Sequence, residues 1–146
     1  MNQKIAESFK PTGVYVGATW GMLGTGVLAY SIGIWRAALE LNEKGFYLAV
    51  FLLAMFSVVT LQKVVRDKLE NIPVTNIFYG MSWAAFIASL LLLVIGLFNA
   101  TLSLSEKGFY GISFVLSLFS VVTVQKNIRD IAVVDRLQIR EAGAEA

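Results

Sequence analysis

The chain has 146 residues, of which 57% are hydrophobic and 15% are charged, with a net charge of +2. Soluble domains carry roughly 25% charged residues, so this composition excludes a soluble globular protein and indicates a membrane protein. The length leaves no room for a separate catalytic domain, and the absence of cysteine and histidine excludes disulfides, thiolate or imidazole metal ligands and the commonest general base. We expect no enzyme activity, no catalytic residue, no cofactor and no metal site.

The first predicted element is a retained membrane helix. The segment Met1 to Gly13 is short and polar, and the apolar run that follows is longer than the roughly 7–15 residues of a cleavable signal core. Four apolar stretches follow one another along the chain: Val14–Trp35, Phe46–Leu61, Ile77–Phe98 and Phe109–Val124. The second and fourth are shorter than the roughly 20 residues needed to cross a bilayer, so we expect both to continue as helix into their polar flanks.

Helix boundaries are indicated by polar residues. Asn42 and Ser105 precede Glu-Lys-Gly and are predicted to cap the second and fourth helices, with the glutamate at the positive end of the dipole. Past the other ends, Lys63 with Asp67 and Lys126 with Asp130 have the i,i+4 spacing of ion pairs within a helix. Pro73 is predicted to stop the second helix.

The sequence contains an internal duplication. Glu43-Lys44-Gly45-Phe46-Tyr47 returns at Glu106, and Gln62-Lys63-x-x-Arg66-Asp67 returns at Gln125, both after 63 residues; 20 of the 35 positions from Gly33–Asp67 to Gly96–Asp130 are identical. The fold class predicted is all-α: one integral membrane four-helix bundle made of two tandem helical hairpins with parallel topology. Repeat 1 covers about 14–67, repeat 2 about 77–130, and 131–146 form a cytoplasmic tail.

Lysine and arginine counts predict the orientation. Nine of these residues lie on the side of the termini, and only Arg36, Lys44 and Lys107 lie on the other side. By the positive-inside rule both termini face the cytoplasm. Because the basic residues flank apolar runs, we expect lipid rather than nucleic acid as their partner.

Small residues recur at every fourth position of the first and third helices. The two stripes consist of Gly13, Gly17, Gly21, Thr25, Ala29 and Gly33, and of Gly80, Ala84, Ala88 and Gly96 with Leu92 interrupting. Small residues let helices approach closely in lipid. We expect the stripes to pack the two repeats together; packing between protomers and a pore lining are the alternatives.

No Asp, Glu, Lys or Arg lies inside the apolar stretches, which argues against a proton-coupled exporter. The charged residues gather in repeated motifs at the membrane interfaces: Glu43, Lys44, Gly45, Tyr47, Glu106, Lys107, Gly108 and Tyr110 on one side, and Gln62, Lys63, Arg66, Asp67, Gln125, Lys126, Arg129 and Asp130 on the other. They are interpreted as caps, headgroup anchors and ion pairs, with a docking surface for a cytoplasmic partner as the alternative. We expect Arg66 to reach Asp130, and Arg129 to reach Asp67.

The residues after Asp130 allow two interpretations. Arg129, Arg136 and Arg140 fall near one helical stripe, so the tail is either a basic helix lying on the inner leaflet or a frayed polar segment.

The repeated motifs, together with Trp35-x-Ala37 and Phe98-Asn99-Ala100, resemble the YiaA/YiaB family of bacterial inner-membrane proteins, which have a two-helix domain that occurs twice in the longer members. One departure is Arg36, which stands where the second copy has Asn99. The resemblance implies a bacterial plasma-membrane location and no enzyme. Our hypothesis is a non-enzymatic membrane protein with an interaction or membrane-organising role, with stress as one setting, acting with a second copy or a protein partner. The alternative is an oligomeric channel or facilitator for a small solute.

Overall fold

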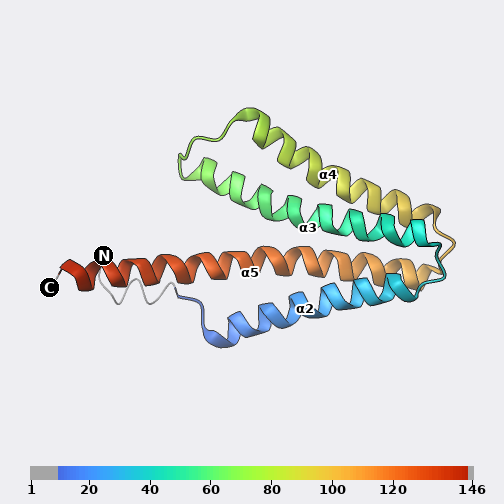
Figure 1. The fold of residues 1–146 in the computed structure, drawn as a ribbon, viewed down its shortest axis with the longest axis horizontal. Coiled ribbons are helices and arrows are strands. Elements are labelled where there is room, and N and C mark those ends of the chain that lie inside the picture. The colour runs from blue at the N-terminus through green and yellow to red at the C-terminus, as the bar shows by residue number, and fades with distance from the viewer. Residues whose placement is uncertain (1–9, 145–146) are drawn as a thin grey trace.

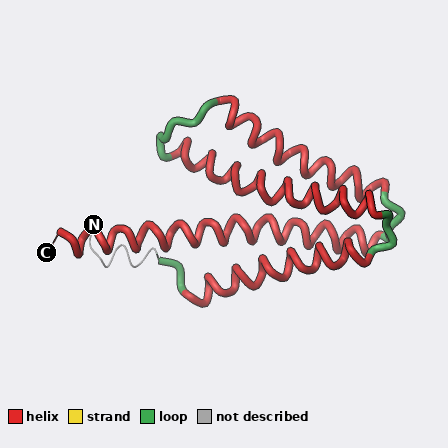
Figure 2. The backbone as a smooth tube through the Cα atoms, in the orientation of Figure 1, coloured by secondary structure: helices red, strands yellow, loops and turns green. Residues whose placement is uncertain are grey.

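The computed structural model describes residues 10–144, which form four helices and no strand (Figures 1 and 2). The helices are α2 (Gly13–Arg36), α3 (Leu41–Leu69), α4 (Asn76–Asn99) and α5 (Leu104–Ala144). The all-α prediction is confirmed. We call the end with the connections 37–40 and 100–103 the hairpin end. The termini end is the opposite one, with Lys10 and the α3–α4 connection.

Three of the described helices, α3, α4 and α5, are long and apolar enough to cross a membrane. The composition and these helices therefore identify the chain as an integral membrane protein. Helix α2 has the length, with 24 residues, but its glycines and threonines dilute its apolar character. It runs beside α5 (Figure 1), so its crossing stays a prediction that this packing supports.

The residues that cap the helix starts are repeated in the duplication. Thr12 and Thr75, which are 63 residues apart, cap α2 and α4 by accepting hydrogen bonds at 3.3 Å from the N–H groups of Tyr15 and Phe78. The predicted caps Asn42 and Ser105 are wrong, because α3 and α5 begin earlier. The N–H groups of Glu40 and Ser103 donate at 2.8 Å to the carboxylates of Glu43 and Glu106, which are the third helical residues of α3 and α5.

The two repeats end differently. Helix α3 stops at Leu69, because Asn71 adopts a left-handed conformation with φ of 57° and Ile72 N–H returns to the Asp67 carbonyl. Asn71 therefore ends the helix before Pro73 is reached, which corrects the predicted stop. In repeat 2 the equivalent residues are Val134 and Arg136, neither of which breaks a helix.

Helix α5 consequently runs on as one 41-residue helix. Figure 1 shows its last part in line with its apolar part. Both interpretations of the tail are therefore wrong: it is not frayed over the described residues, and it cannot lie flat on a membrane that α5 crosses.

The two helices of each repeat spread apart, and each packs along a helix of the other repeat; we call this the interlocked arrangement. Helix α2 packs along α5 and α3 packs along α4, while α3 and α5 lie side by side in the middle (Figure 1). The first helix of each repeat thus pairs with the second helix of the other. The first and last described residues, Lys10 and Ala144, lie at one end of the bundle, as the hairpin topology predicts.

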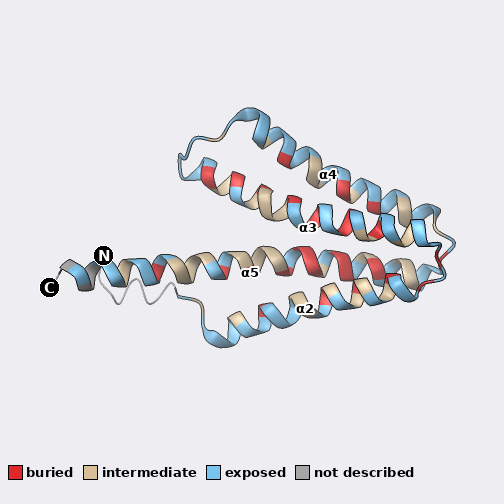
Figure 3. Ribbon diagram, in the orientation of Figure 1, coloured by how far each residue is buried: buried red, intermediate tan, exposed pale blue. Residues whose placement is uncertain are grey.

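The core is densest near the hairpin end (Figure 3). Tyr30 stacks on Phe51 with ring centroids 4.4 Å apart, and Phe114 and Tyr110 lie 5.8 and 6.4 Å from Tyr30. Leu39 and Leu102, from the two connections, close this core from outside. The Tyr30 hydroxyl donates to the Tyr47 carbonyl at 3.1 Å, which fixes α2 against α3.

Most members of the small-residue stripes do not pack the repeats together, which corrects the prediction for those residues. Gly13, Gly17, Gly21 and Gly80 have no neighbouring side chain within 4 Å of where a Cβ would lie, and Thr25, Ala84 and Ala88 are exposed. Only the last members, Gly33 and Gly96, meet the opposite repeat. The helix contacts instead use positions spaced by three and four residues, including Thr19, Gly26 and Tyr30 on α2.

Candidate functional site

The repeated Glu-Lys-Gly-Phe-Tyr motif packs against a glycine of the opposite repeat. A Cβ on Gly96 would lie 2.7 Å from the Phe46 ring and 3.2 Å from the Tyr47 ring, and a Cβ on Gly33 would lie 2.7 Å from the Tyr110 ring. The rings therefore need glycine opposite them. Gly45 and Gly108 inside the motifs are different, since each has room for a Cβ.

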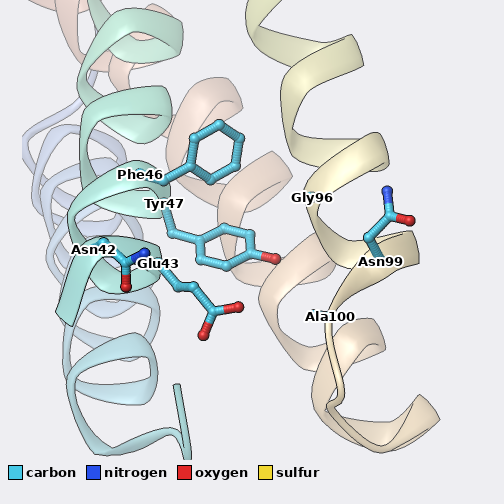
Figure 4. Close-up of a pocket in the computed structure, with 7 residues that line it drawn as sticks. All are labelled: Asn42, Glu43, Phe46, Tyr47, Gly96, Asn99 and Ala100. Carbon is cyan, nitrogen blue, oxygen red and sulfur yellow. The ribbon is translucent and has the colours of Figure 1, made fainter. Parts of the chain in front are cut away.

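A pocket of about 250 Å³ opens at this junction between the start of α3 and the end of α4 (Figure 4). Its lining residues are Asn42, Glu43, Phe46, Tyr47, Gly96, Asn99 and Ala100. Phe46 and Tyr47 reach from α3 toward α4, and their rings stand nearly perpendicular, at 76° with centroids 5.4 Å apart. The Asn99 amide is turned back along α4, where it donates to the Ile95 carbonyl at 2.8 Å.

The equivalent junction in the other half differs in its hydrogen bonds. The Tyr110 hydroxyl donates to the Gly33 carbonyl at 3.1 Å, whereas the Tyr47 hydroxyl has no hydrogen-bond partner among residues 10–144. Glu106 accepts from both the N–H and the hydroxyl of Ser103, and these bonds lower the pKa of Glu106. Glu43 accepts one hydrogen bond from the described residues, through Oε2.

Charge also distinguishes the two junctions. Arg36 occupies the position equivalent to Asn99, so only the junction around Gly33 carries a guanidinium. The lysines of the motif lie at the rims, and Lys107 donates to the Phe98 carbonyl at 3.3 Å, at the end of α4. Within the described residues, the pocket beside Gly96 therefore combines a carboxylate with a tyrosine hydroxyl that has no hydrogen-bond partner.

At the termini end the predicted cross-repeat ion pairs are absent from the described residues, and each arginine binds the aspartate next to it. Arg66 lies 2.8 Å from Asp67, and Arg129 lies 2.8 Å from Asp130. The i,i+4 pairs are confirmed, with Lys63 at 2.6 Å from Asp67 and Lys126 at 2.7 Å from Asp130. The reason is local: one aspartate satisfies both neighbouring cations, and α3 leans away from α5 here (Figure 1).

These aspartates lie beyond the apolar stretches of their helices. Hydrogen bonds from Lys63 and Arg66 lower the pKa of Asp67, although its side chain is only 7% exposed. For Asp130, burial raises the pKa, but the hydrogen bonds from Lys126 and Arg129 outweigh it and the net shift is downward. Both carboxylates are therefore held ionised.

Two polar residues of the α2–α5 contact, Ser113 and Asn127, were missed by the sequence analysis. Ser113, Ser117, Ser120 and Asn127 are buried on one face of α5. Asn127 donates through its side-chain nitrogen to the Thr19 hydroxyl at 3.2 Å, while its Oδ1 and the hydroxyl of Ser120 are buried without a partner in the part of the chain that the structure describes. Their spacing of three, four and seven residues was the available signal.

The glutamines of the repeated motif share one feature. The side-chain oxygens of Gln62 and Gln125 are both buried without a hydrogen-bond partner among the described residues. The two copies are therefore alike in this one respect.

Comparison with known proteins decides the family. The "yiaA/B two helix domain" matches residues 15–67 and again residues 78–130. The chain belongs to this family. The two matches coincide with the predicted repeats to within about one residue at each boundary.

Among curated proteins, the chain is 55% identical to "Inner membrane protein YiaA" of Escherichia coli (strain K12) over 112 residues, which cover 77% of each chain. It is 49% identical over 47 residues to "Uncharacterized membrane protein YubF" of Bacillus subtilis (strain 168), covering 32% of this chain and 54% of the relative. No solved structure matches. Family membership and the apolar helices together identify a membrane protein, which is in contact with lipid. One relative is named for the inner membrane.

Proposed function

We propose that this protein is a non-enzymatic component of the bacterial inner membrane that acts by association with further copies of itself in the bilayer. The observation that carries the proposal is the exposure of the small-residue stripes on α2 and α4. Glycines with open space around them on a membrane helix leave the backbone accessible, and close approach of a second helix covers it.

A second feature of α2 supports association. Its outward face carries Gly17, Gly21 and Thr25. Such a face gains little from contact with lipid tails. Packing against a protein surface provides the van der Waals contacts that lipid does not.

The hydrogen bonds of the buried hydroxyls favour an interaction role over a channel. Ser57 donates to the Ala54 carbonyl at 3.1 Å, and Ser117 donates to the Ser113 carbonyl at 2.7 Å. A Cβ on Gly26 would lie only 2.6 Å from the Ser117 hydroxyl, so α2 and α5 touch along this polar face. Hydroxyls bonded within their own helix at a closed contact support packing rather than permeation.

Single-molecule photobleaching in lipid bilayers tests the association. We expect the wild type to form oligomers and Gly21→Leu to weaken them by about tenfold or more, because leucine blocks close approach. Gly111→Leu is the matched control, since Gly111 has equal room within the protomer but lies on α5, outside both stripes. A wild type that is monomeric, or equal effects of the two variants, would contradict the proposal.

We also propose that both termini face the cytoplasm, from the nine-to-three excess of lysine and arginine. A reporter that is active only outside the cytoplasm should be silent after residue 146 and active when inserted near Ser103. The reverse pattern would show the opposite orientation.

A further inference from the structure

The pocket at the hairpin end has the composition of a small cation site. We propose that the pocket between α3 and α4 binds a primary ammonium group, with the Glu43 carboxylate as counter-ion and the Phe46 and Tyr47 rings as its aromatic walls. This proposal is independent of oligomerisation.

The carboxylate is available for a ligand. Glu43 uses Oε2 to accept the Glu40 N–H at 2.8 Å, and among the described residues Oε1 has neither a hydrogen bond nor an ion pair. Figure 4 shows this carboxylate below the Tyr47 ring, between α3 and the end of α4. A charged hydrogen bond from an ammonium group to a partly shielded carboxylate is among the stronger single contacts that a protein offers.

The Tyr47 hydroxyl is the second polar group of the pocket. The residue is only 3% exposed, yet its hydroxyl has no partner among residues 10–144, and in Figure 4 it points toward α4. The corresponding hydroxyl of Tyr110 is already bonded to the Gly33 carbonyl. The hydroxyl of this pocket-lining residue is thus free to bond a ligand, and an ammonium N–H can donate to its oxygen.

Two aromatic faces complete the environment. The rings of Phe46 and Tyr47 meet at 76°, and Phe46 is 38% exposed. Cations are attracted to aromatic faces within about 6 Å of the ring centroid, and more strongly where water is reduced. The volume of about 250 Å³ is below the roughly 300–1,000 Å³ of pockets for drug-sized ligands, so the ligand is a small head group.

The second junction has the same kind of aromatic pair, with Phe109 and Tyr110 at 71°, but it differs in its polar groups and serves as an internal control. Its glutamate, Glu106, is engaged by Ser103 through two donors, its tyrosine hydroxyl is bonded to Gly33, and Arg36 replaces the asparagine. A guanidinium at this position opposes binding of a cation. We therefore expect one ammonium site per chain.

A primary ammonium group could reach the pocket from two sources: a soluble amine or the head group of phosphatidylethanolamine. Two measurements separate them. Calorimetric titration of the detergent-solubilised protein with ethanolamine, with glycerol as the neutral control, tests the soluble source. Native mass spectrometry after incubation with equal amounts of phosphatidylethanolamine and phosphatidylglycerol tests the lipid source.

Glu43→Gln and Glu106→Gln form the matched pair of variants. Glutamine at the third helical position retains the capping interaction, so both proteins should fold. We expect Glu43→Gln to weaken ammonium binding by about tenfold or more, and Glu106→Gln to leave it unchanged. Asn99→Arg, which copies the second junction, should also weaken it.

Preference for phosphatidylethanolamine that depends on Glu43 would support the lipid source, and ethanolamine binding alone with the same dependence would support a soluble amine. The proposal is overturned if the wild type prefers neither ethanolamine to glycerol nor phosphatidylethanolamine to phosphatidylglycerol. It is equally overturned if Glu43→Gln and Glu106→Gln have the same effect.

Discussion

Glycines on α2 divide into two groups according to what a side chain would meet. A Cβ on Gly26 would lie 2.6 Å from the Ser117 hydroxyl and 3.3 Å from its Cα, whereas a Cβ on Gly21 would meet nothing within 4 Å. We predict that Gly26→Ala lowers the free energy of unfolding by about 1–3 kcal/mol, because α2 must move away from α5. Thermal unfolding in detergent measures this effect.

Gly21→Ala is the control for this experiment. Alanine favours helix over glycine by up to about 1 kcal/mol, so this variant should be as stable as the wild type or more stable. Equal destabilisation by the two substitutions would show that the close contact of Gly26 with Ser117 is not the reason for the lower stability of Gly26→Ala.

Asn127 is a buried polar residue with one side-chain oxygen left without a partner. The equivalent residue in repeat 1 is Val64, which is buried in the α3–α4 contact. We predict that Asn127→Val changes the free energy of unfolding by less than about 1 kcal/mol, since the lost hydrogen bond to Thr19 is offset by removal of an unsatisfied group. A loss well above that, in reversible unfolding experiments, would show that Oδ1 has a partner.

At the scale of the helix, the charged ends of α3 and α5 make stability depend on pH. The pKa of Asp67 is lower in the folded chain than its ordinary value of about 3.9, because Lys63 and Arg66 donate to the carboxylate. A lowered folded pKa stabilises the native state above the unfolded pKa, and this stabilisation is lost as the pH falls through the folded value. We predict decreasing stability from about pH 5 downward, measured as a melting temperature.

Asp67→Asn should flatten the acid side of this profile and lower stability at pH 7. Lys68→Gln is the control, since Lys68 lies over the Tyr79 ring at 4.1 Å and forms no described contact with Asp67. An unchanged acid profile in Asp67→Asn would contradict the role given to this carboxylate.

Helix boundaries were predictable where a long apolar run is bounded by polar residues. The stretches Val14–Trp35 and Ile77–Phe98 match α2 and α4 to within one residue at each end. The end of α3 was not predictable, because Asn71 tolerates a positive φ and stops the helix before the proline. The missing stop in repeat 2 could be found only by comparing Val134 with Asn71 across the duplication.

The candidate pocket was only partly predictable. The duplication pointed to Glu43 and Tyr47 as repeated residues at an interface, but identical motifs predict identical sites. The difference between the two junctions depends on hydrogen bonds of Tyr110 and Ser103, which become visible only when the opposite repeat is in place.

At the scale of the whole molecule, the repeats exchange helices. The sequence could not predict this pairing, because the second helices of the two repeats are so similar that α2 has nearly the same surface to pack on in either case. The small-residue stripes suggested a contact between repeats, but the contact uses Thr19, Gly26 and Tyr30 on a different face. What decides the pairing is the complementarity of Gly26 to Ser117 and of Asn127 to Thr19.

The exchange of helices is tested most directly by disulfide formation in a chain that has no natural cysteine. Thr19→Cys combined with Asn127→Cys places two thiols where the native side chains lie 3.2 Å apart, whereas Thr19→Cys with Val64→Cys joins the equivalent positions within repeat 1. We predict rapid intramolecular crosslinking of the first pair and none of the second, because α5 lies between α2 and α3 at this level (Figure 1). Crosslinking of residues 19 and 64 within one chain, without crosslinking of residues 19 and 127, would contradict the interlocked arrangement.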